Sequence, residues 1–284
     1  MIDTLLKTID ILIAPFQFGF MLQAFAIGAL VAAVGAVLSC FLVLRGWSLM
    51  GDAISHAVLP GIVLAYIAGI PLAVGAFGSG LFCAVATGWV KNNSRIKEDT
   101  VMGVVFTGMF AVGLVLFSKT PSDMHLDHIL FGNILGITSD QVWETSVLSA
   151  IVLGTVLVLR RDLLLVCFDP QHARVLGRPV RALTYLLLVL LSLAIVAAMK
   201  AVGLVLVIAM LITPGATALL LTKRFERMLV TATAIAVGSA LAGIYISFFA
   251  DGSPAACIVL VQALIFVTTL FIRGLRQSSL SLNK

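Results

Sequence analysis

Hydrophobic segments close to 20 residues long recur along the whole chain and are separated by short polar joints. A helix needs about 20 apolar residues to cross a bilayer, so each segment is a candidate span. The joints at 69–71 and 198–203 are so short that eight or ten spans also fit the pattern. The nine candidates are 20–44, 53–69, 71–90, 101–118, 142–159, 182–199, 201–222, 229–249 and 255–272. We therefore predict an all-α, polytopic membrane protein with about 8–9 transmembrane helices.

Composition supports one membrane domain. Hydrophobic residues make up 61% of the chain and charged residues 11%, whereas a soluble domain carries about 25% charged residues. Residues 1–18 carry three charges and a proline and lack the basic start and cleavage site of a signal peptide, so we expect an interfacial amphipathic segment there. The expected organisation is therefore a segment 1–18, a transmembrane domain 19–273 and a tail 274–284.

The positions of the basic residues predict the orientation. Of the 18 Lys and Arg residues, all but Lys7, Lys119 and Lys200 fall on the same side of the nine-span arrangement. The positive-inside rule makes that side cytoplasmic, with the C-terminus inside and the N-terminus outside. The net charge of +5 is thus a signal of topology, and no basic stripe with interleaved aromatic residues suggests a nucleic-acid partner.

One stretch places two ionisable side chains in an apolar span. It reads Arg45-Gly-Trp-Ser-Leu-Met-Gly-Asp-Ala-Ile-Ser-His-Ala-Val-Leu-Pro-Gly61, and on a helix Asp52 and His56 share one face about 6 Å apart along the axis. If the span begins near Trp47, they lie about 8 and 14 Å into a core about 30 Å thick. Burying such groups is costly unless a partner compensates, and a divalent metal ion is one such partner. A plain hydrogen bond that ties two helices together is an equally weighted alternative.

One carboxylate and one imidazole are too few to hold a metal ion. A homodimer brings two of each to a shared axis, and an oxygen and nitrogen shell suits Mn, Fe or Zn better than Cu(I). Because only neutral imidazole binds metal, we expect metal binding at such a site to weaken at acid pH.

Two loops add candidate residues. The loop expected outside the membrane contains Asp123, His125, Asp127 and His128; these suit an outer funnel or docking surface, although a solvated polar loop is the favoured interpretation. On the cytoplasmic side, Asp169 is a good N-cap, Pro170 suits the first helical position and Gly177 suits a left-handed stop, which predicts a short surface helix. That helix is either a docking element or a plain connection.

Other chemistry is missing from the sequence. The four cysteines show no CxxC spacing, so apolar packing is expected for each. No GxxxxGK[ST] loop occurs, and any use of ATP must therefore belong to a separate chain. Without a catalytic motif, an enzyme is the least favoured class.

Four stretches together resemble the metal-ion permeases of bacterial binding-protein-dependent ABC importers, closest to the manganese and iron branch. They are 45–61, His128-Ile-Leu-Phe-Gly-Asn-Ile-Leu135, 168–177 and 202–218, which contains Thr213-Pro214-Gly215. The resemblance covers nearly the whole chain. The Thr-Pro-Gly segment is expected to bend and pack its helix rather than to bind metal.

The resemblance implies an inner-membrane permease subunit with no permanently bound cofactor, which moves Mn, Fe or Zn inward. Asp52 and His56 match the family's metal ligands, each supplied twice by a permease dimer. The implied partners are a cytoplasmic ATP-binding subunit, a second identical or homologous permease and an extracytoplasmic metal-binding protein. The coupling helix that contacts the ATPase corresponds to Asp169, Pro170, Gln171, His172, Ala173, Arg174, Val175, Leu176 and Gly177.

Two rival functions stay open at this point. An ion-coupled secondary carrier would use Asp52 and His56 to relay protons and would need no ATPase. A permease for a bulky metal chelate would share the helical scaffold but would not need paired ionisable ligands.

Overall fold

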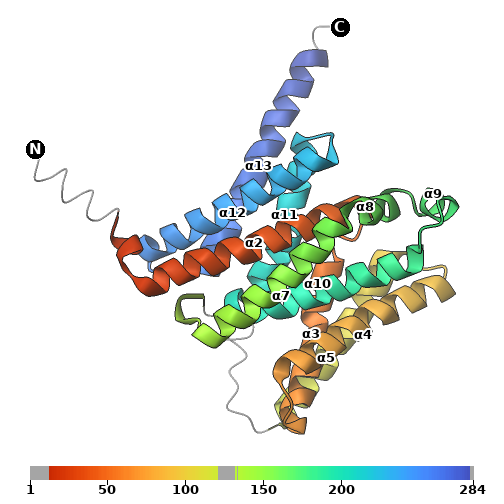
Figure 1. Cartoon of the computed structure of the whole chain (residues 1–284), viewed down its shortest axis with the longest axis horizontal. Coiled ribbons are helices and arrows are strands. Elements are labelled where there is room, and N and C mark those ends of the chain that lie inside the picture. Colours follow the sequence, from red (N-terminus) through yellow and green to blue (C-terminus); the bar gives the residue numbers. More distant parts are fainter. Residues whose placement is uncertain (1–12, 121–131, 133, 282–284) are drawn as a thin grey trace, which may run out of the picture.

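The computed structural model describes residues 13–120, 132 and 134–281, and every regular element within them is helical. The prediction of an all-α membrane protein is therefore confirmed. The elements, labelled as in Figure 1, are α2 (Gly19–Arg45), α3 (Met50–Ala68), α4 (Leu72–Asn93), α5 (Glu98–Lys119), the 3₁₀ turn η1 (Ile134–Gly136), α7 (Ser139–Val158), α8 (Arg160–Phe168), α9 (Pro170–Val175), α10 (Val180–Val202), α11 (Leu204–Leu221), α12 (Phe225–Ala250) and α13 (Pro254–Ser281).

In the described part of the chain, nine helices are long and apolar enough to cross a membrane. Neither short joint is a continuous helix, and each turns at a glycine. Gly69 ends α3 with φ 68°, and Gly203 separates α10 from α11 with φ 78°. Residues other than glycine rarely adopt these backbone angles. Glycine at both positions therefore allows the chain to turn sharply toward the next span.

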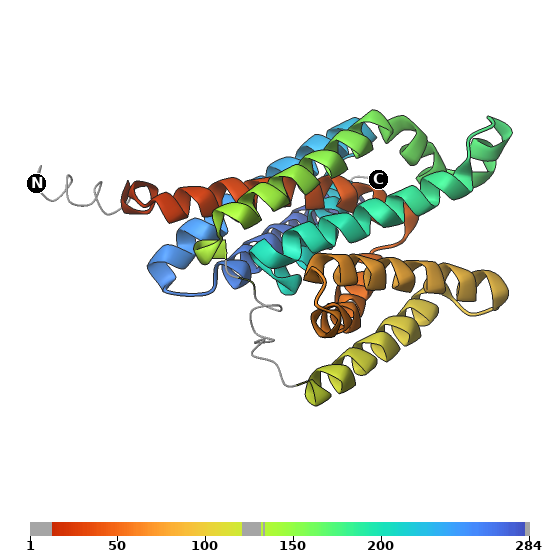
Figure 2. The same cartoon turned by 60° about the horizontal axis from the view of Figure 1, so that its bottom comes forward.

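The helices form two groups that meet along α3, α10 and α11. In the larger group α2 is largely buried and packs against α11, α12 and α7, while α13 packs against α11 and α12. In the smaller group α3 lies between α4 and α5, and Figure 2 shows these three helices projecting from one side of the bundle. The ionisable pair lies on α3, the most enclosed helix of this group.

Glycines bring α3 and its neighbours into backbone contact. A methyl group added to Gly61 of α3 would collide with the carbonyl oxygen of Gly75 on α4, and the reverse substitution would meet the carbonyl oxygen of Gly61. On the other side, a Cβ on Gly113 of α5 would lie 2.9 Å from the ring of Pro60. Small residues allow this approach, which is how membrane helices gain packing energy without a hydrophobic driving force.

A serine on α2 bridges the proline-containing part of α11. Pro214 lacks an N–H group and so cannot complete the helical hydrogen-bond ladder. The Ser39 hydroxyl donates to the carbonyl oxygen of Ile212 (3.1 Å) and accepts from the backbone N–H of Gly215 (3.0 Å). This contact agrees with the expected packing role of the Thr213–Gly215 segment.

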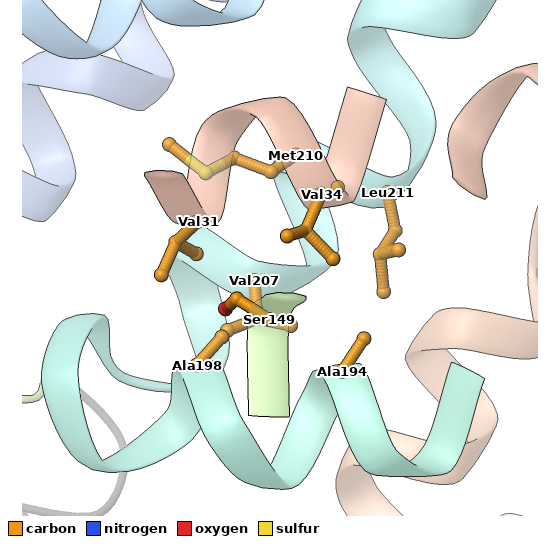
Figure 3. Close-up of a pocket in the computed structure, with 9 residues that line it drawn as sticks. Val31, Val34, Ser149, Ala194, Ala198, Val207, Met210 and Leu211 are labelled. Atoms are coloured by element: carbon orange, nitrogen blue, oxygen red, sulfur yellow. The ribbon is translucent and has the colours of Figure 1, made fainter. Parts of the chain in front are cut away.

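A cavity of about 10 Å³ lies where α2, α7, α10 and α11 meet. Figure 3 shows its apolar lining and the hydroxyl of Ser149 at its edge. That volume is about one water-sized sphere. The cavity is therefore a packing gap rather than a passage for substrate.

The structure differs from the sequence prediction at some boundaries. Helix α3 begins at Met50 rather than at 53, so Asp52 is within its first turn. Helix α8, in the loop expected on the cytoplasmic side, was not predicted. At the N-terminal end, residues 13–17 are helical, and Phe16 stacks on Phe25 with ring centroids 5.3 Å apart. Residues 1–12 lie outside the described part, so the expected segment 1–18 stays a prediction.

Candidate metal site and cytoplasmic coupling surface

Asp52 and His56 lie side by side on α3. The Nε2 atom of His56 is 3.3 Å from Oδ1 of Asp52, and the two side chains are 31% and 29% exposed. The pair joins two residues of the same helix, so it does not itself tie two helices together. Partial exposure leaves both groups reachable by a small ion.

Two aromatic rings of α5 hold the imidazole. Phe106 stacks on His56 with ring centroids 5.9 Å apart, and Phe110 meets it edge to face at 5.2 Å. The Nδ1 atom of His56 is buried without a hydrogen-bond partner. Nε2 is therefore the ring nitrogen placed to bind a ligand beside Asp52. The four-residue spacing of the two phenylalanines indicates that they share one helix face, but nothing in the sequence places that face against His56.

The separation of the two atoms suits a bridging metal ion. With metal–nitrogen and metal–oxygen distances of about 2.1 Å, atoms 3.3 Å apart subtend about 100° at the metal, between octahedral and tetrahedral values. Within the described residues, no group of three or more His, Cys, Asp or Glu side chains comes together. The pair by itself offers two candidate ligand atoms, which are fewer than a metal ion needs.

The outer-loop candidates Asp123, His125, Asp127 and His128 lie outside the described residues. Their expected role as a funnel or docking surface stays a prediction.

The predicted cytoplasmic helix is present as α9. The carboxylate of Asp169 accepts hydrogen bonds from the backbone N–H groups of Gln171 (3.0 Å) and His172 (2.9 Å), and Pro170 begins the helix. Gly177 follows with φ 71°, and its N–H and that of Arg178 close the helix end by donating to Arg174 and Ala173 carbonyl oxygens. Ala173 faces inward.

Large apolar side chains are exposed on α9 and directly beside it. Val175 is 83% exposed and Leu176 56% exposed, and Phe168 at the end of α8 is 78% exposed. Exposed apolar side chains that gather at one site are typical of a protein contact. The unpredicted helix α8 contacts α9, and its Asp162 pairs with Arg178 (3.3 Å), which follows the end of α9. In the sequence, the feature that could have indicated α8 is the apolar run 163–166, which follows Arg160 and Arg161.

Arg45 connects the corner before α3 with this surface. Its guanidinium donates to the carbonyl oxygen of Val166 in α8 (2.9 Å) and to the hydroxyl of Thr184 in α10 (3.3 Å), and it lies over the Trp47 ring at 4.4 Å. The residue therefore joins three elements within a few residues of Asp52. In the sequence, Arg45 is an orientation signal and the first residue of the stretch 45–61, and nothing there indicates this contact.

The cysteines give no thiolate site. Cys40, Cys83 and Cys167 are buried and Cys257 is partly buried, and none forms a disulfide. Burial raises the pKa of the Cys167 thiol in α8 to about 11, and nearby Arg45 only partly opposes this. At neutral pH that thiol stays protonated and poorly reactive.

Known proteins resemble this chain over nearly its full length. It is 57% identical over 256 residues to the "chelated iron transport system membrane protein YfeD" of Yersinia pestis, covering 90% of this chain and 86% of that protein. It is 49% identical over 256 residues to the "manganese transport system membrane protein MntB" of Synechocystis, covering 90% and 84%. The structure of PsaBC from Streptococcus pneumoniae in complex with Fab matches with a TM-score of 0.86 and 37% identity, covering 97% of this chain and 100% of that one.

The family assignment rests on these similarities and on a family-wide match. The description "ABC 3 transport family" applies to residues 17–273, which contain every described membrane-crossing helix but the last few residues of α13. The chain therefore belongs to the ABC 3 transport family and is the membrane-spanning component of an ABC transporter.

Proposed function

We propose that this chain is the permease subunit of an ATP-driven importer that moves a divalent metal ion, manganese or iron, into the cytoplasm of a bacterium. The observation that carries the proposal is the Asp52–His56 pair on α3, with oxygen and nitrogen 3.3 Å apart and both side chains partly exposed. Relatives named for manganese and for chelated iron transport support the same substrate class. Zinc has similar ligand preferences and stays within the proposed range.

The metal ion would bind where two permease chains meet. Each chain supplies one carboxylate and one imidazole, so a dimer of identical or homologous chains provides four ligands of the type that Mn, Fe and Zn accept. Along α3, His56 lies about 9 Å from Met50 and about 5 Å from the helix midpoint at Leu59. The proposed site is therefore in the cytoplasmic half of the span, close to the middle of the membrane.

The partners follow from what this chain lacks and exposes. ATP hydrolysis belongs to a separate cytoplasmic subunit, which contacts α9 at Val175, Leu176 and the adjoining residues of the Asp169–Gly177 segment. An extracytoplasmic binding protein delivers the ion to the outer face. Movement of α9 would pass to α8, which it contacts, and from α8 to Arg45. Arg45 in turn lies over Trp47 at the corner before α3, the helix that carries the proposed metal site.

Metal uptake with matched variants tests the site. Asp52→Asn keeps the shape of the side chain and removes its charge, and His56→Ala removes the imidazole. We expect both to reduce accumulation of one metal about 10-fold or more, as loss of a metal ligand commonly does. Asp140→Asn, on the exposed first turn of α7, is the matched control and should retain uptake.

Cellular Mn, Fe and Zn are measured by elemental mass spectrometry in metal-limited cells at equal membrane abundance of the variants. Normal accumulation in both site variants would return the pair to a structural role.

The rival functions predict different results in the same cells. An ion-coupled carrier would keep working without the ATPase subunit and stop with an uncoupler. A chelate permease would take up the intact chelate and tolerate loss of His56. The name of YfeD includes chelated iron, so uptake of free and chelated iron should be compared directly.

A further inference from the structure

Asp52 and His56 are the two positions where the first part of α3 is accessible. From Met50 to Val63, every other residue of this helix is buried. The Nε2 atom of His56 lies 3.3 Å from Oδ1 of Asp52, whereas its Nδ1 atom is buried and has no hydrogen-bond partner among the described residues. One side of the imidazole is therefore available to an ion, and the other is enclosed without a polar contact.

A histidine that binds a metal ion needs contacts that fix its ring. The torsion that turns an imidazole about its Cβ–Cγ bond has broad minima, and the usual restraint is a hydrogen bond from the second ring nitrogen to a carboxylate or carbonyl oxygen. Within the described part of the chain, Nδ1 of His56 has no such acceptor. The orientation of this imidazole must therefore come from other contacts.

Two phenylalanine rings of α5 supply those contacts. The Phe106 ring is inclined by 25° to the imidazole, with ring centroids 5.9 Å apart. The Phe110 ring stands at 77° to the imidazole, with ring centroids 5.2 Å apart. Because the two rings lie at different angles to the imidazole, together they restrict both its tilt and its rotation.

Helix α5 presents both rings on the face that packs against α3. Four residues at spacings of four, four and three share this face; they are Met102, Phe106, Phe110 and Gly113. Met102 is buried, and Gly113 lies against Pro60 of α3. Few other residues of α5 are buried, and among the described elements it packs mainly against α3 and α4. The position of α5 on α3 therefore determines how the imidazole is held.

We propose that Phe106 and Phe110 are positioning residues, which orient His56 for the ion in place of a hydrogen bond at Nδ1. This inference rests on the proposed function, since it takes Asp52 and His56 as the site of the transported ion. An acceptor at Nδ1 would make the imidazole a more basic ligand and hold the metal more tightly. Ring contacts fix the geometry without that gain, which suits a site that must release its ion in every transport cycle.

Metal binding by the purified complex of permease and ATPase subunits tests the role of the rings. Phe106→Leu and Phe110→Leu each remove one ring and keep an apolar side chain, whereas Phe106→Tyr and Phe110→Tyr keep the ring. Phe117→Leu is the matched control, because it makes the same change at a partly buried position of α5 about two turns beyond Phe110. The probe is Co²⁺, which accepts oxygen and nitrogen ligands and whose visible absorption reports both occupancy and coordination geometry.

The two leucine variants should lose affinity for the probe. We expect Phe106→Leu and Phe110→Leu each to weaken Co²⁺ binding about 10-fold, as loss of an orienting partner of a ligating histidine commonly does. The absorption spectrum of the bound ion should change as well, because the imidazole is no longer fixed. Both tyrosine variants should bind at least as tightly as the unaltered protein, and Phe117→Leu should bind with unchanged affinity and spectrum.

A shift of α5 as a whole gives an independent test. A Cβ on Gly113 would lie 2.9 Å from the Pro60 ring of α3, whereas one on Gly108 of the same helix has open space. Gly113→Ala should therefore move α5 away from α3 and weaken Co²⁺ binding, although it leaves His56 and both phenylalanines in place. Gly108→Ala should bind Co²⁺ like the unaltered protein.

His56→Ala separates failure of this inference from failure of the proposed function. If His56→Ala binds Co²⁺ as tightly as the unaltered protein, Asp52 and His56 are not the ion site and the proposed function loses its basis. If His56→Ala abolishes binding but Phe106→Leu and Phe110→Leu bind normally with an unchanged spectrum, the site stands and the rings do not position it. Equal losses in Phe110→Leu and Phe117→Leu would also overturn the inference, because they would show a general effect of packing on α5.

Discussion

At the scale of single residues, buried hydroxyl groups form hydrogen bonds with backbone N–H and C=O groups, for which lipid hydrocarbon offers no partner. Ser39 ties α2 to the proline-containing part of α11, because its hydroxyl both donates to the carbonyl oxygen of Ile212 and accepts from the N–H of Gly215. Ser239 on α12 is also fully buried, but it bonds only to the carbonyl oxygen of Ile235 in its own helix. The two serines therefore make a matched pair.

Ser39→Ala should lower the stability of the folded protein by about 1–2 kcal/mol, since each hydrogen bond within a membrane contributes about 0.6 kcal/mol and an unsatisfied buried group costs more. Ser239→Ala should change stability little. Thermal unfolding of both variants in the same detergent measures the difference. Equal midpoints for the two variants would mean that α11 holds its proline-containing turn without help from α2.

The residue scale is also where prediction from sequence was least complete. The spacing of Asp52 and His56 placed both on one helix face, and the structure agrees. Spacing within one segment carries no information on contacts between distant segments. For that reason Phe106 and Phe110 beside His56, and the contacts of Arg45 with Val166 and Thr184, became visible only in the fold.

At the scale of elements, hydrophobic length predicted the spans and local caps predicted α9. Both signals depend only on residues close in sequence, so they can be recognised without knowing which helices pack together. Asp169, Pro170 and Gly177 accordingly occupy the expected positions of a short helix. Helix α8 was missed because nine residues are too few for a span and it begins immediately after α7. The starts of spans were misplaced by a few residues where polar side chains, such as Asp52, lie in the first turn.

The contact between α3 and α4 should depend on Gly75. A methyl group at this position meets the backbone of Gly61, whereas one at Gly78, a turn further along α4, meets open space. Gly75→Ala should therefore cost about 1–3 kcal/mol through overpacking and reduce metal uptake, because α3 carries Asp52 and His56. Gly78→Ala should keep both stability and uptake. Abundance in the membrane and thermal unfolding measure the comparison, and equal stability of the two variants would refute the close packing.

The N-cap of α9 is expected to matter for coupling. Asp169→Ala removes the acceptor for two backbone N–H groups and should destabilise this short helix by about 1 kcal/mol. Asp169→Ser keeps a capping oxygen and should behave much more like the unaltered chain. The ratio of metal transported to ATP hydrolysed by the reconstituted transporter reports the effect. An unchanged ratio in Asp169→Ala would argue that α9 does not transmit movement from the ATPase.

At the scale of the whole molecule, the basic joints gather at one end of the bundle although they are far apart in sequence. Arg45 reaches α8, Arg160 pairs with Glu226 at the start of α12, and Arg273 donates to the carbonyl oxygen of Leu220 at the end of α11. In a bundle whose successive spans run in opposite directions, two joints lie on the same side of the membrane when an even number of spans separates them. An even number of spans separates each consecutive pair of these joints along the chain. The arrangement of the helices is thus compatible with the basic joints sharing one side of the membrane, and which side faces the cytoplasm stays a prediction.

Labelling of single cysteines tests this orientation. Ser253→Cys lies in the exposed turn between α12 and α13, and Lys223→Cys in the exposed turn between α11 and α12. A Cys257→Ala background removes the one partly exposed thiol, and the others are buried, with Cys167 also kept protonated by a pKa of about 11. In intact spheroplasts an impermeant maleimide should label the Ser253→Cys protein and reach the Lys223→Cys protein only after permeabilisation. The reverse pattern would place the basic end, and α9 with it, outside the cell, where no cytoplasmic ATPase could contact it.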